Sequence, residues 1–287
     1  MKEDYFNGIE SVEFNSIENG VKVLILGTIH GNEICGKIAI DNVIKKIRSN
    51  EIKLKSGSIT FIPICNPVAF DNNKRYYETN LNRVIKRNDN PILYEEKIAN
   101  ILTNYIDNCD YMLDLHSMAE NGSPFVFQDI IDEGNKNFAK AQGLRYILQG
   151  WPNIYEDCEI NDFSTQTYCC KFKNKIGVTV ECGSHRDESA IKIAEQSIIN
   201  TLIYLNIIDG NPIGCNESTT IKMKKVFIKD RIGSINGFSH LDMIRKNDVI
   251  AKYDDGCEII SDDDYIMVLP NNNCNLNEEW FYLGKHE

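Results

Sequence analysis

Two histidines and two glutamates stand at positions where they could act on one metal ion. His30 and Glu33 lie three residues apart after an apolar run, and His116 and Glu181 lie at the ends of two others. Two imidazoles and a carboxylate form the three-ligand set of catalytic zinc sites, which keeps a fourth position for water. Zinc lowers the pKa of that water from 15.7 to about 7, and Glu181 could pass its proton to a leaving nitrogen. Asp114 would share a strand face with His116. It either orients that histidine or is a structural carboxylate at the strand end, with its own hydrogen-bond partners.

The His-x-x-Glu spacing alone does not select a site, because it occurs twice. His185 and Glu188 repeat the spacing of His30 and Glu33. We favour the first pair because it follows an apolar strand and a glycine. His185, four residues after Glu181, either supports the site from outside the ligand set or begins a helix.

Three apolar runs would bring these side chains to one edge of a sheet. Residues 21–26, 111–115 and 176–180 indicate buried strands. Between and after the strands, apolar residues recur at helical spacing, and the expected helices cover residues 33–48, 94–106 and 188–208. Strands that alternate with such helices predict a mainly parallel sheet covered on both faces, with ligands outside the carboxyl ends of the strands.

The composition changes at residues 209–214, where Asp-Gly-Asn-Pro-Ile-Gly indicates a linker. Beyond it the helical period disappears. Residues 221–229 alternate between apolar and polar, and residues 254–256 are typical of a hairpin turn. We therefore predict a catalytic α/β domain over residues 1–210 and a small β-rich domain over residues 211–287.

Composition excludes several classes of function. The chain has 287 residues and a formal net charge of −11, which disfavours binding to a phosphate backbone. No apolar run approaches the roughly 18 residues that span a bilayer, and the first ten residues are polar rather than a signal region. Ten cysteines without a Cys-x-x-Cys pair predict reduced thiols and a cytoplasmic protein. Nothing in the sequence selects an oligomeric state.

A larger set of short motifs appears in a fixed order along the chain. They are His30-Gly-Asn-Glu33, Asn66-Pro67, Arg75-Tyr76, Asn80-Leu-Asn-Arg83, Asp114-Leu-His116, Val180-Glu-Cys-Gly183, Asp248-Val-Ile-Ala251 and Glu279-Trp-Phe-Tyr-Leu-Gly284. In this order they resemble the succinylglutamate desuccinylase/aspartoacylase family, within the zinc carboxypeptidase-like superfamily. The resemblance implies a mainly parallel mixed sheet flanked by helices, followed by a small C-terminal β-domain that narrows the entrance.

The resemblance also implies the cofactor and its ligands. It implies one Zn²⁺ per chain bound by His30, Glu33 and His116, with Glu181 as the general base. The residue types agree with the chemistry derived above.

Three further residues acquire roles through the resemblance. It implies that Arg75 polarises the scissile carbonyl and that Asn82 and Arg83 hold a substrate carboxylate. A guanidinium suits both tasks, since it forms strong, directional hydrogen bonds to oxyanions. The sequence departs from the family twice: Asn80 replaces the usual aspartate, and residues 162–175 lack the arginine that recognises an acidic side chain in aspartoacylase-like members.

The predicted function is zinc-dependent hydrolysis of the amide bond of a small anionic N-acyl amino acid. One alternative is a metallocarboxypeptidase that acts on peptides, which a narrowed pocket would disfavour. Another is a non-catalytic binding protein that keeps the fold. A more remote alternative makes Cys182 the nucleophile.

Overall fold

Strands and helices alternate through most of the chain in the computed structural model, which describes residues 8–119, 121–156, 162–185, 187–215 and 217–287. The helices are α1 (Cys35–Arg48), α2 (Pro67–Asp71), η2 (Leu81–Arg83), α3 (Tyr94–Asp107), α4 (Glu133–Ala141), α5 (Trp151–Glu156), α6 (Thr165–Thr167), η3 (Tyr168–Phe172) and α7 (Ser189–Tyr204). The strands are β1 (Val12–Asn15), β2 (Lys22–Gly27), β3 (Ser58–Ile62), β4 (Tyr111–Met118), β5 (Phe125–Gln128), β6 (Tyr146–Gln149), β7 (Ile176–Ser184), β8 (Thr219–Ile228), β9 (Gly233–Ile235), β10 (Met243–Ile244), β11 (Val249–Tyr253), β12 (Glu258–Ile260), β13 (Tyr265–Val268) and β14 (Glu279–His286).

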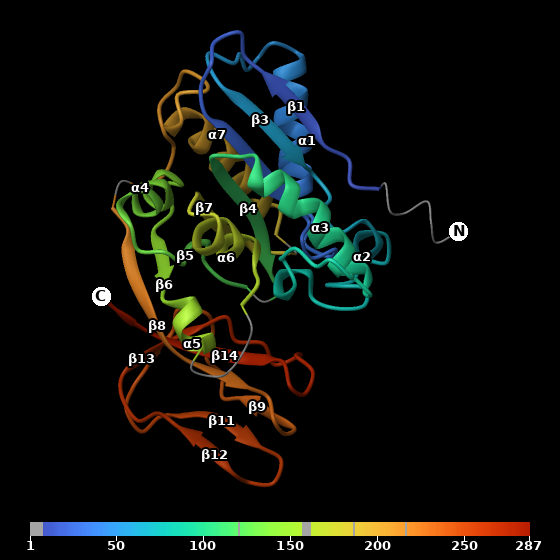
Figure 1. Cartoon of the computed structure of the whole chain (residues 1–287). Helices are drawn as coiled ribbons and strands as arrows, with labels where there is room; N and C mark the ends of the chain where they lie inside the picture. Colours follow the sequence, from blue (N-terminus) through green and yellow to red (C-terminus); the bar gives the residue numbers. More distant parts are fainter. Residues whose placement is uncertain (1–7, 120, 157–161, 186, 216) are drawn as a thin grey trace.

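One mixed sheet forms the centre of the molecule (Figure 1). Its strand order is β1-β3-β2-β4-β7-β5-β6-β8-β14-β13-β10, and β12-β11-β9 form a separate three-stranded sheet. Strands β3, β2, β4 and β7 are parallel neighbours, whereas β5 runs antiparallel to β7. The predicted α/β fold, a mainly parallel mixed sheet flanked by helices, is confirmed.

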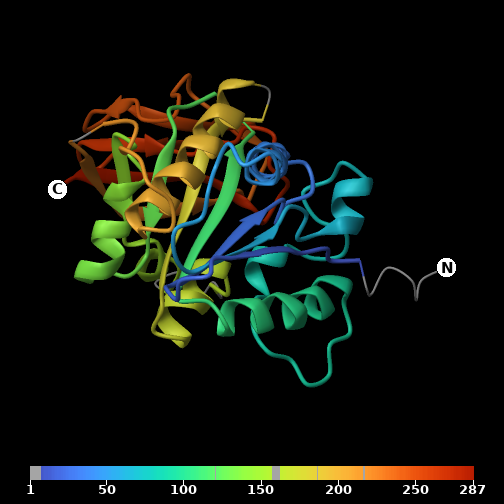
Figure 2. The same ribbon diagram turned by 90° about the horizontal axis from the view of Figure 1, so that it is seen from above.

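The two faces of the sheet are covered by different helices, as the view from above shows (Figure 2). Side chains alternate between these faces: Val23 and Ile25 of β2 pack in the cluster that contains α1 and α7, whereas Leu24 and Leu26 pack toward α3. All four are at most 1% exposed. Burial on both sides explains why this strand is a continuous apolar run.

The same alternation orients β4. Leu113 and Leu115 join the cluster with α1 and α7, so Asp114 and His116 lie on the opposite face. This is the shared strand face that the sequence predicts for these two residues.

The C-terminal strands continue the central sheet. β8 pairs with β6 in parallel, and β14 pairs with β8 in antiparallel register. A separate apolar core lies among these strands, built around the fully buried Trp280 and Phe281. The division into residues 1–210 and 211–287 remains our proposal, and the two proposed parts share one sheet (Figure 1).

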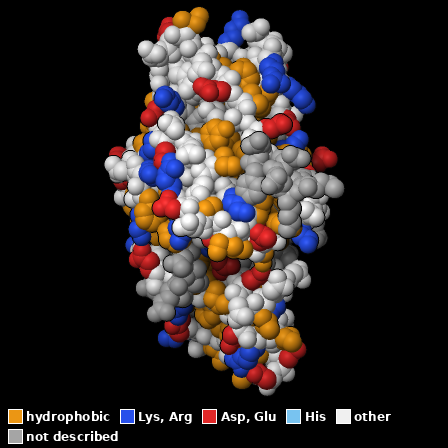
Figure 3. All heavy atoms as spheres, turned by 45° about the vertical axis from the view of Figure 1, so that its right-hand side comes forward, with side chains coloured by type: hydrophobic (Ala, Val, Ile, Leu, Met, Phe, Trp, Pro, Cys, Tyr) orange, Lys and Arg blue, Asp and Glu red, His pale blue; other side chains and the backbone are white. Residues whose placement is uncertain are grey.

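Within the described residues, no helix is both long and apolar enough to cross a bilayer. On the face drawn in Figure 3, acidic and basic side chains are interspersed, with hydrophobic side chains in small groups between them.

Candidate active site

The loop after β2 folds tightly and brings His30 next to Glu33. Thr28 has a positive φ of 55°, and the Glu33 amide donates a hydrogen bond to the His30 carbonyl (3.1 Å). Gly31 lies against α2, where a Cβ atom would come within 2.1 Å of the Ala69 backbone. Only glycine fits such a close approach. The sequence places the helix start at residue 33, but the turn uses that residue and α1 begins at Cys35.

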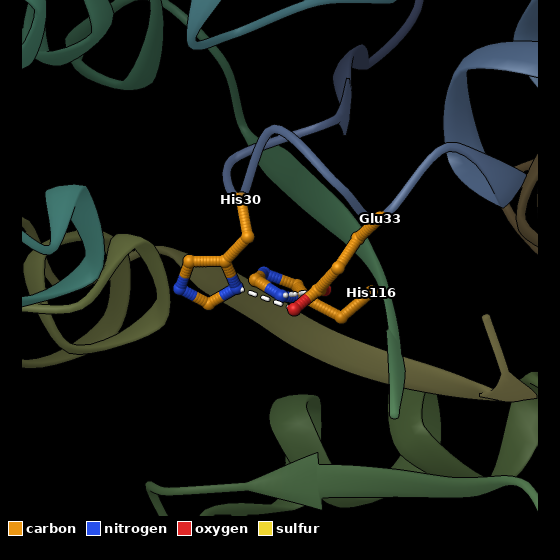
Figure 4. Close-up of side chains that lie close together, drawn as sticks. All are labelled: His30, Glu33 and His116. Carbon is orange, nitrogen blue, oxygen red and sulfur yellow. Dashed lines mark hydrogen bonds and ion pairs between the residues drawn. The ribbon is translucent and has the colours of Figure 1, made fainter. Parts of the chain in front are cut away.

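His30, Glu33 and His116 converge on one point (Figure 4). Glu33 Oε1 lies 2.8 Å from His30 Nδ1, and Glu33 Oε2 lies 3.0 Å from His116 Nδ1. All three side chains are buried, and their candidate ligand atoms lie within 4.8 Å of one another. The structure therefore brings together the three residues that the sequence predicts as metal ligands.

The hydrogen bonds of the two Nε2 atoms indicate which nitrogen of each imidazole carries the hydrogen. His30 Nε2 lies 3.1 Å from Asn80 Oδ1, and His116 Nε2 lies 3.0 Å from Asp114 Oδ2. Asn80 Oδ1 also accepts the Asn82 amide, so it is oriented as an acceptor. Each Nε2 must then carry the ring hydrogen, which leaves the lone pair of a neutral ring at Nδ1, facing Glu33.

Two acceptor nitrogens that face one carboxylate need a cation between them. Burial, together with the charge of Arg75, lowers the pKa of His30 to about 4, so this ring is neutral at neutral pH. Burial disfavours the charged form of His116, but the charges of Asp114 and Glu33 outweigh burial and raise its pKa well above the usual range. A proton on His116 would satisfy one contact with Glu33, whereas a divalent ion would satisfy both. Metal-bound histidines usually donate their second N–H to a carboxylate or carbonyl oxygen, as both rings do here. The residues present fit a divalent metal.

Glu181 lies beside this group but outside its hydrogen bonds. The register of β4 and β7 pairs it with His116, and both line the same cavity. Its Oε2 atom is buried without a hydrogen-bond partner among the described residues. Burial and the charge of Glu33 raise the pKa of Glu181 to about 8. A buried carboxyl group whose pKa lies near neutral pH suits proton transfer in either direction.

Arg75 lies at the mouth of the cavity. Its Nη1 donates to Glu33 Oε1 (2.9 Å), and its side chain is 49% exposed. The Gly31 amide donates to the Arg75 carbonyl (3.2 Å), which ties this loop to the loop of His30. The guanidinium is therefore near the candidate metal ligands and still open to solvent.

Asn82 and Arg83 line the cavity but already have protein partners. Asn82 Oδ1 accepts the Thr165 amide (3.0 Å). Arg83 Nη2 donates to Glu279 Oε1 (2.6 Å) and to the Tyr155 hydroxyl (2.8 Å). The partners Glu279 and Tyr155 were not predicted from the sequence, although Glu279 opens one of the quoted C-terminal motifs.

These side chains surround a cavity of about 1180 Å³. Its walls come from both proposed parts of the chain: Trp151 lies before residue 210, whereas Glu278 and Tyr282 lie after it. The Tyr76 hydroxyl donates to Glu278 Oε1 (3.3 Å), which links the two proposed parts at the cavity wall. The narrowing of the entrance by the C-terminal part stays a prediction.

The structure places two residues whose roles the sequence leaves open, His185 and Cys182. His185 lines the cavity and its Nδ1 lies 2.7 Å from the Ser117 hydroxyl, so it adjoins the site without belonging to the ligand group. Cys182 is buried in the apolar cluster on the other face of the sheet, where burial raises the pKa of its thiol. A buried thiol of raised pKa is a poor nucleophile, which disfavours a role for Cys182 in catalysis.

Comparison with known proteins decides the family. The model of the succinylglutamate desuccinylase/aspartoacylase catalytic domain matches residues 19–204. The chain belongs to this family. The resemblance predicted from the sequence motifs is thereby confirmed.

Individual members of the family are distant relatives. A probable aspartoacylase from Prochlorococcus marinus subsp. pastoris is 26% identical over 246 residues, which cover 79% of this chain and 77% of the relative. An N-alpha-acetyl-L-2,4-diaminobutyric acid deacetylase from Halomonas elongata is 24% identical over 199 residues, 67% of this chain and 56% of the relative.

Solved structures share the fold of the whole chain. The product-bound ectoine utilization protein EutE (DoeB) from Ruegeria pomeroyi has a TM-score of 0.78 at 18% identity, and covers 96% of this chain with 88% of its own. A succinylglutamate desuccinylase from Silicibacter sp. TM1040 has a TM-score of 0.77 at 19% identity. The match covers 97% of this chain and 89% of that structure's chain. The family relationship supports hydrolysis of the amide bond of N-acyl amino acids.

Proposed function

We propose that the protein is a zinc-dependent amidohydrolase that cleaves the amide bond of a small N-acyl amino acid. One observation carries the proposal: the buried Glu33 carboxylate faces two imidazole nitrogens whose opposite nitrogens are held by acceptors. Two imidazoles and a carboxylate suit zinc in particular, and zinc would displace any proton that His116 holds toward Glu33. The two curated relatives named above are named for acylated amino acids, which supports the substrate class.

The metal would be held by His30, Glu33 and His116. A zinc ion on three protein ligands keeps a fourth position open and supplies a Lewis acid that activates water at neutral pH. Asp114, which accepts from His116, would keep that ring in the tautomer that leaves Nδ1 free for the metal.

The protein groups around the metal would carry the proton and the developing charge. Glu181 would take a proton from the water that attacks the amide carbon and deliver it to the nitrogen as the carbon–nitrogen bond breaks. Arg75 would donate to the carbonyl oxygen as it gains negative charge, through the N–H groups that it does not share with Glu33. The products are a carboxylate and a free amine.

Asn82 and Arg83 would hold the carboxylate of the substrate. Both line the cavity, and Asn82 uses only its amide oxygen toward Thr165, which leaves its NH₂ group for a ligand. Arg83 is anchored by Glu279 and Tyr155, so its guanidinium is held in one orientation before the substrate arrives. A donor that is already held in place loses less conformational entropy when the substrate binds than a mobile one.

The main alternative, a carboxypeptidase acting on polypeptides, is less well supported. The family relationship and the relatives named for acylated amino acids favour a small N-acyl amino acid over a peptide.

The test combines metal analysis with turnover. We expect about one zinc per chain in the wild type and loss of both metal and hydrolysis of N-acyl amino acids in His116→Ala. The exposed His286 provides a matched control, and His286→Ala should keep both. Glu181→Gln should retain the metal and lose about 10²- to 10⁴-fold in kcat, the usual contribution of a general base.

Two results would contradict the proposal. If the wild type binds no zinc when it is offered, the hydrolytic mechanism fails and a binding protein becomes the better interpretation. If C-terminal residues are released one by one from peptides while N-acyl amino acids remain intact, the protein is a carboxypeptidase.

A further inference from the structure

The charges that line the active-site cavity are unbalanced. Seven carboxylates and three cationic side chains line it; the cations are Lys74, Arg75 and Arg83. Arg83 is already paired with Glu279, and Arg75 with Glu33. The cavity therefore offers little free positive charge to a second carboxylate on a substrate.

Two of the carboxylates lie together in one part of the wall. Asp129 follows β5 and Asp162 precedes α6, and both reach the hydroxyl of Thr167, at 3.4 Å and 2.7 Å. Among the described residues, no lysine or arginine nitrogen lies within 4.0 Å of either carboxylate. Asp162 Oδ1 is buried and has no hydrogen-bond partner in the described part of the chain. A buried carboxylate oxygen without a donor is costly, and a ligand that donates to it would remove the cost.

The charges of Asp129 and Asp162 also favour a bound cation. Burial raises the pKa of Asp129 well above its usual range, and the charge of Asp162 raises it further. Two like charges this close disfavour each other's ionised form, and a cation between them would stabilise both.

Aromatic rings border the same part of the cavity. Phe127, two residues before Asp129, packs edge to face on Trp151 at a centroid distance of 4.8 Å, and both line the cavity. Tyr282 also packs on Trp151, with ring centroids 4.2 Å apart, and lines the same cavity. Aromatic rings and carboxylates that line one cavity are a favourable surface for an ammonium group and its methylene chain.

The pair lines the same cavity as the candidate metal ligands His30, Glu33 and His116. Thr165 Oγ1 donates to Asp114, which contacts His116. Thr167, which contacts both aspartates, is two residues further along the same short helix. One short helix therefore contacts both the aspartate pair and the hydrogen-bond partner of His116.

We propose that the cavity selects N-acyl amino acids whose own side chain ends in a cation, held by Asp129 and Asp162. The inference rests on the proposed function and specifies its substrate. The acyl amide lies at the metal ligands, the α-carboxylate lies near Arg83 and Asn82, and the side-chain ammonium replaces the missing partner of Asp162. The acidic side chain of an N-acyl aspartate or glutamate would instead meet two carboxylates.

The experiment compares substrates that differ only in the terminal group. Nα-acetylornithine and Nα-acetylnorleucine have side chains of the same length, one ending in ammonium and the other in methyl, and Nα-acetyl-2,4-diaminobutyrate and Nα-acetylnorvaline form a shorter pair. We expect kcat/KM to favour the ammonium member by at least tenfold in one pair, the range of a charged hydrogen bond. Nα-acetylglutamate should be the poorest substrate.

Isosteric variants test which residues create the preference. Asp162→Asn and Asp129→Asn should each reduce the ammonium-to-methyl ratio to threefold or less while hydrolysis of the methyl substrate continues, which also shows that the variant is folded. Glu278→Gln removes one charge from another wall of the cavity and serves as the matched control. It should change the ratio less than twofold.

A binding measurement separates this inference from the proposed function. Calorimetry on Glu181→Gln protein should give a Kd at least tenfold lower for Nα-acetylornithine than for Nα-acetylnorleucine, or the same preference in the shorter pair. If binding shows this preference but the wild type hydrolyses neither, the proposed function fails and the subsite stands. If the methyl or acidic substrates are preferred in both pairs, or if the aspartate variants keep the wild-type ratio, the inference is wrong.

Discussion

Removing the carboxylate of Glu279 should destabilise the folded protein in a pH-dependent way. Glu279 Oε1 accepts from Arg83 Nη2 (2.6 Å) and from the Tyr155 hydroxyl (3.1 Å). The side chains of Arg83 and Glu279 are only 23% and 26% exposed. Burial alone would raise the pKa of Glu279, but the charge and hydrogen bond of Arg83 outweigh burial and lower it to about 2.

The size of the effect follows from that pKa. The difference between about 2 and the ordinary 4.5 corresponds to about 3 kcal/mol of folding free energy, at 1.36 kcal/mol for each pH unit. Glu279→Gln keeps one acceptor oxygen but leaves Arg83 without a counter-charge, so we expect a loss of about 2–3 kcal/mol at pH 7. Because the pKa is depressed in the folded state, this stabilisation is present above about pH 4.5 and disappears as the pH falls toward 2.

Urea denaturation at several pH values measures how the loss of stability in Glu279→Gln depends on pH. The free energies of unfolding of the wild type and Glu279→Gln should differ most at pH 5–7 and converge as the pH approaches 2. The exposed ion pair between Glu156 and Lys171, with an N–O distance of 2.7 Å, provides the control, and Glu156→Gln should cost less than about 0.5 kcal/mol. A difference for Glu279→Gln that is as small as the control, or that does not change with pH, would refute the reasoning.

Three other substitutions have expected outcomes. Asp114→Asn should weaken metal binding about 10- to 100-fold in competition with a chelator, because the His116 ring loses its carboxylate acceptor; unchanged affinity would contradict the fit argument. Arg75→Met should lower kcat about 10²- to 10³-fold in steady-state kinetics with metal content unchanged, unless Arg75 has no role at the oxyanion. Phe61→Ala, in the fully buried core against Phe14, should cost about 3–5 kcal/mol in urea denaturation; a loss below about 1 kcal/mol would argue against tight packing there.

The parts of the site that the sequence predicts well are those set by local signals. An apolar run, a glycine and a polar residue at the strand end are contiguous, so His30, His116 and Glu181 could be placed at one edge of the sheet from pattern alone. The departure at Asn80 is also clear in the structure, because a neutral amide oxygen is sufficient to accept from His30.

What the sequence could not supply depends on long-range contacts. Glu279 is 196 residues from Arg83, and no local pattern predicts that they meet. Asp129 and Asp162 approach each other because both contact Thr167, the last residue of α6.

Some strands, too, are determined by long-range pairing rather than by a local sequence pattern. Strands β5 and β6 have four residues each, too few to establish a period of two. Their place in the sheet is fixed by pairing with β7 and β8, which the sequence pattern does not contain.

The continuity of the sheet from β6 through β8 to β14 has a consequence for the order in which the protein is completed during synthesis. β14 follows every other strand of the sheet in chain order, and it covers the outer edge of β8 from Ile221 to Ile228. Until β14 emerges from the ribosome, that edge is unpaired and able to join another chain. The wall of the cavity that carries Glu279 and Tyr282 is added at the same moment. A nascent chain could therefore form the cluster of His30, Glu33 and His116 well before it has a closed cavity for the substrate.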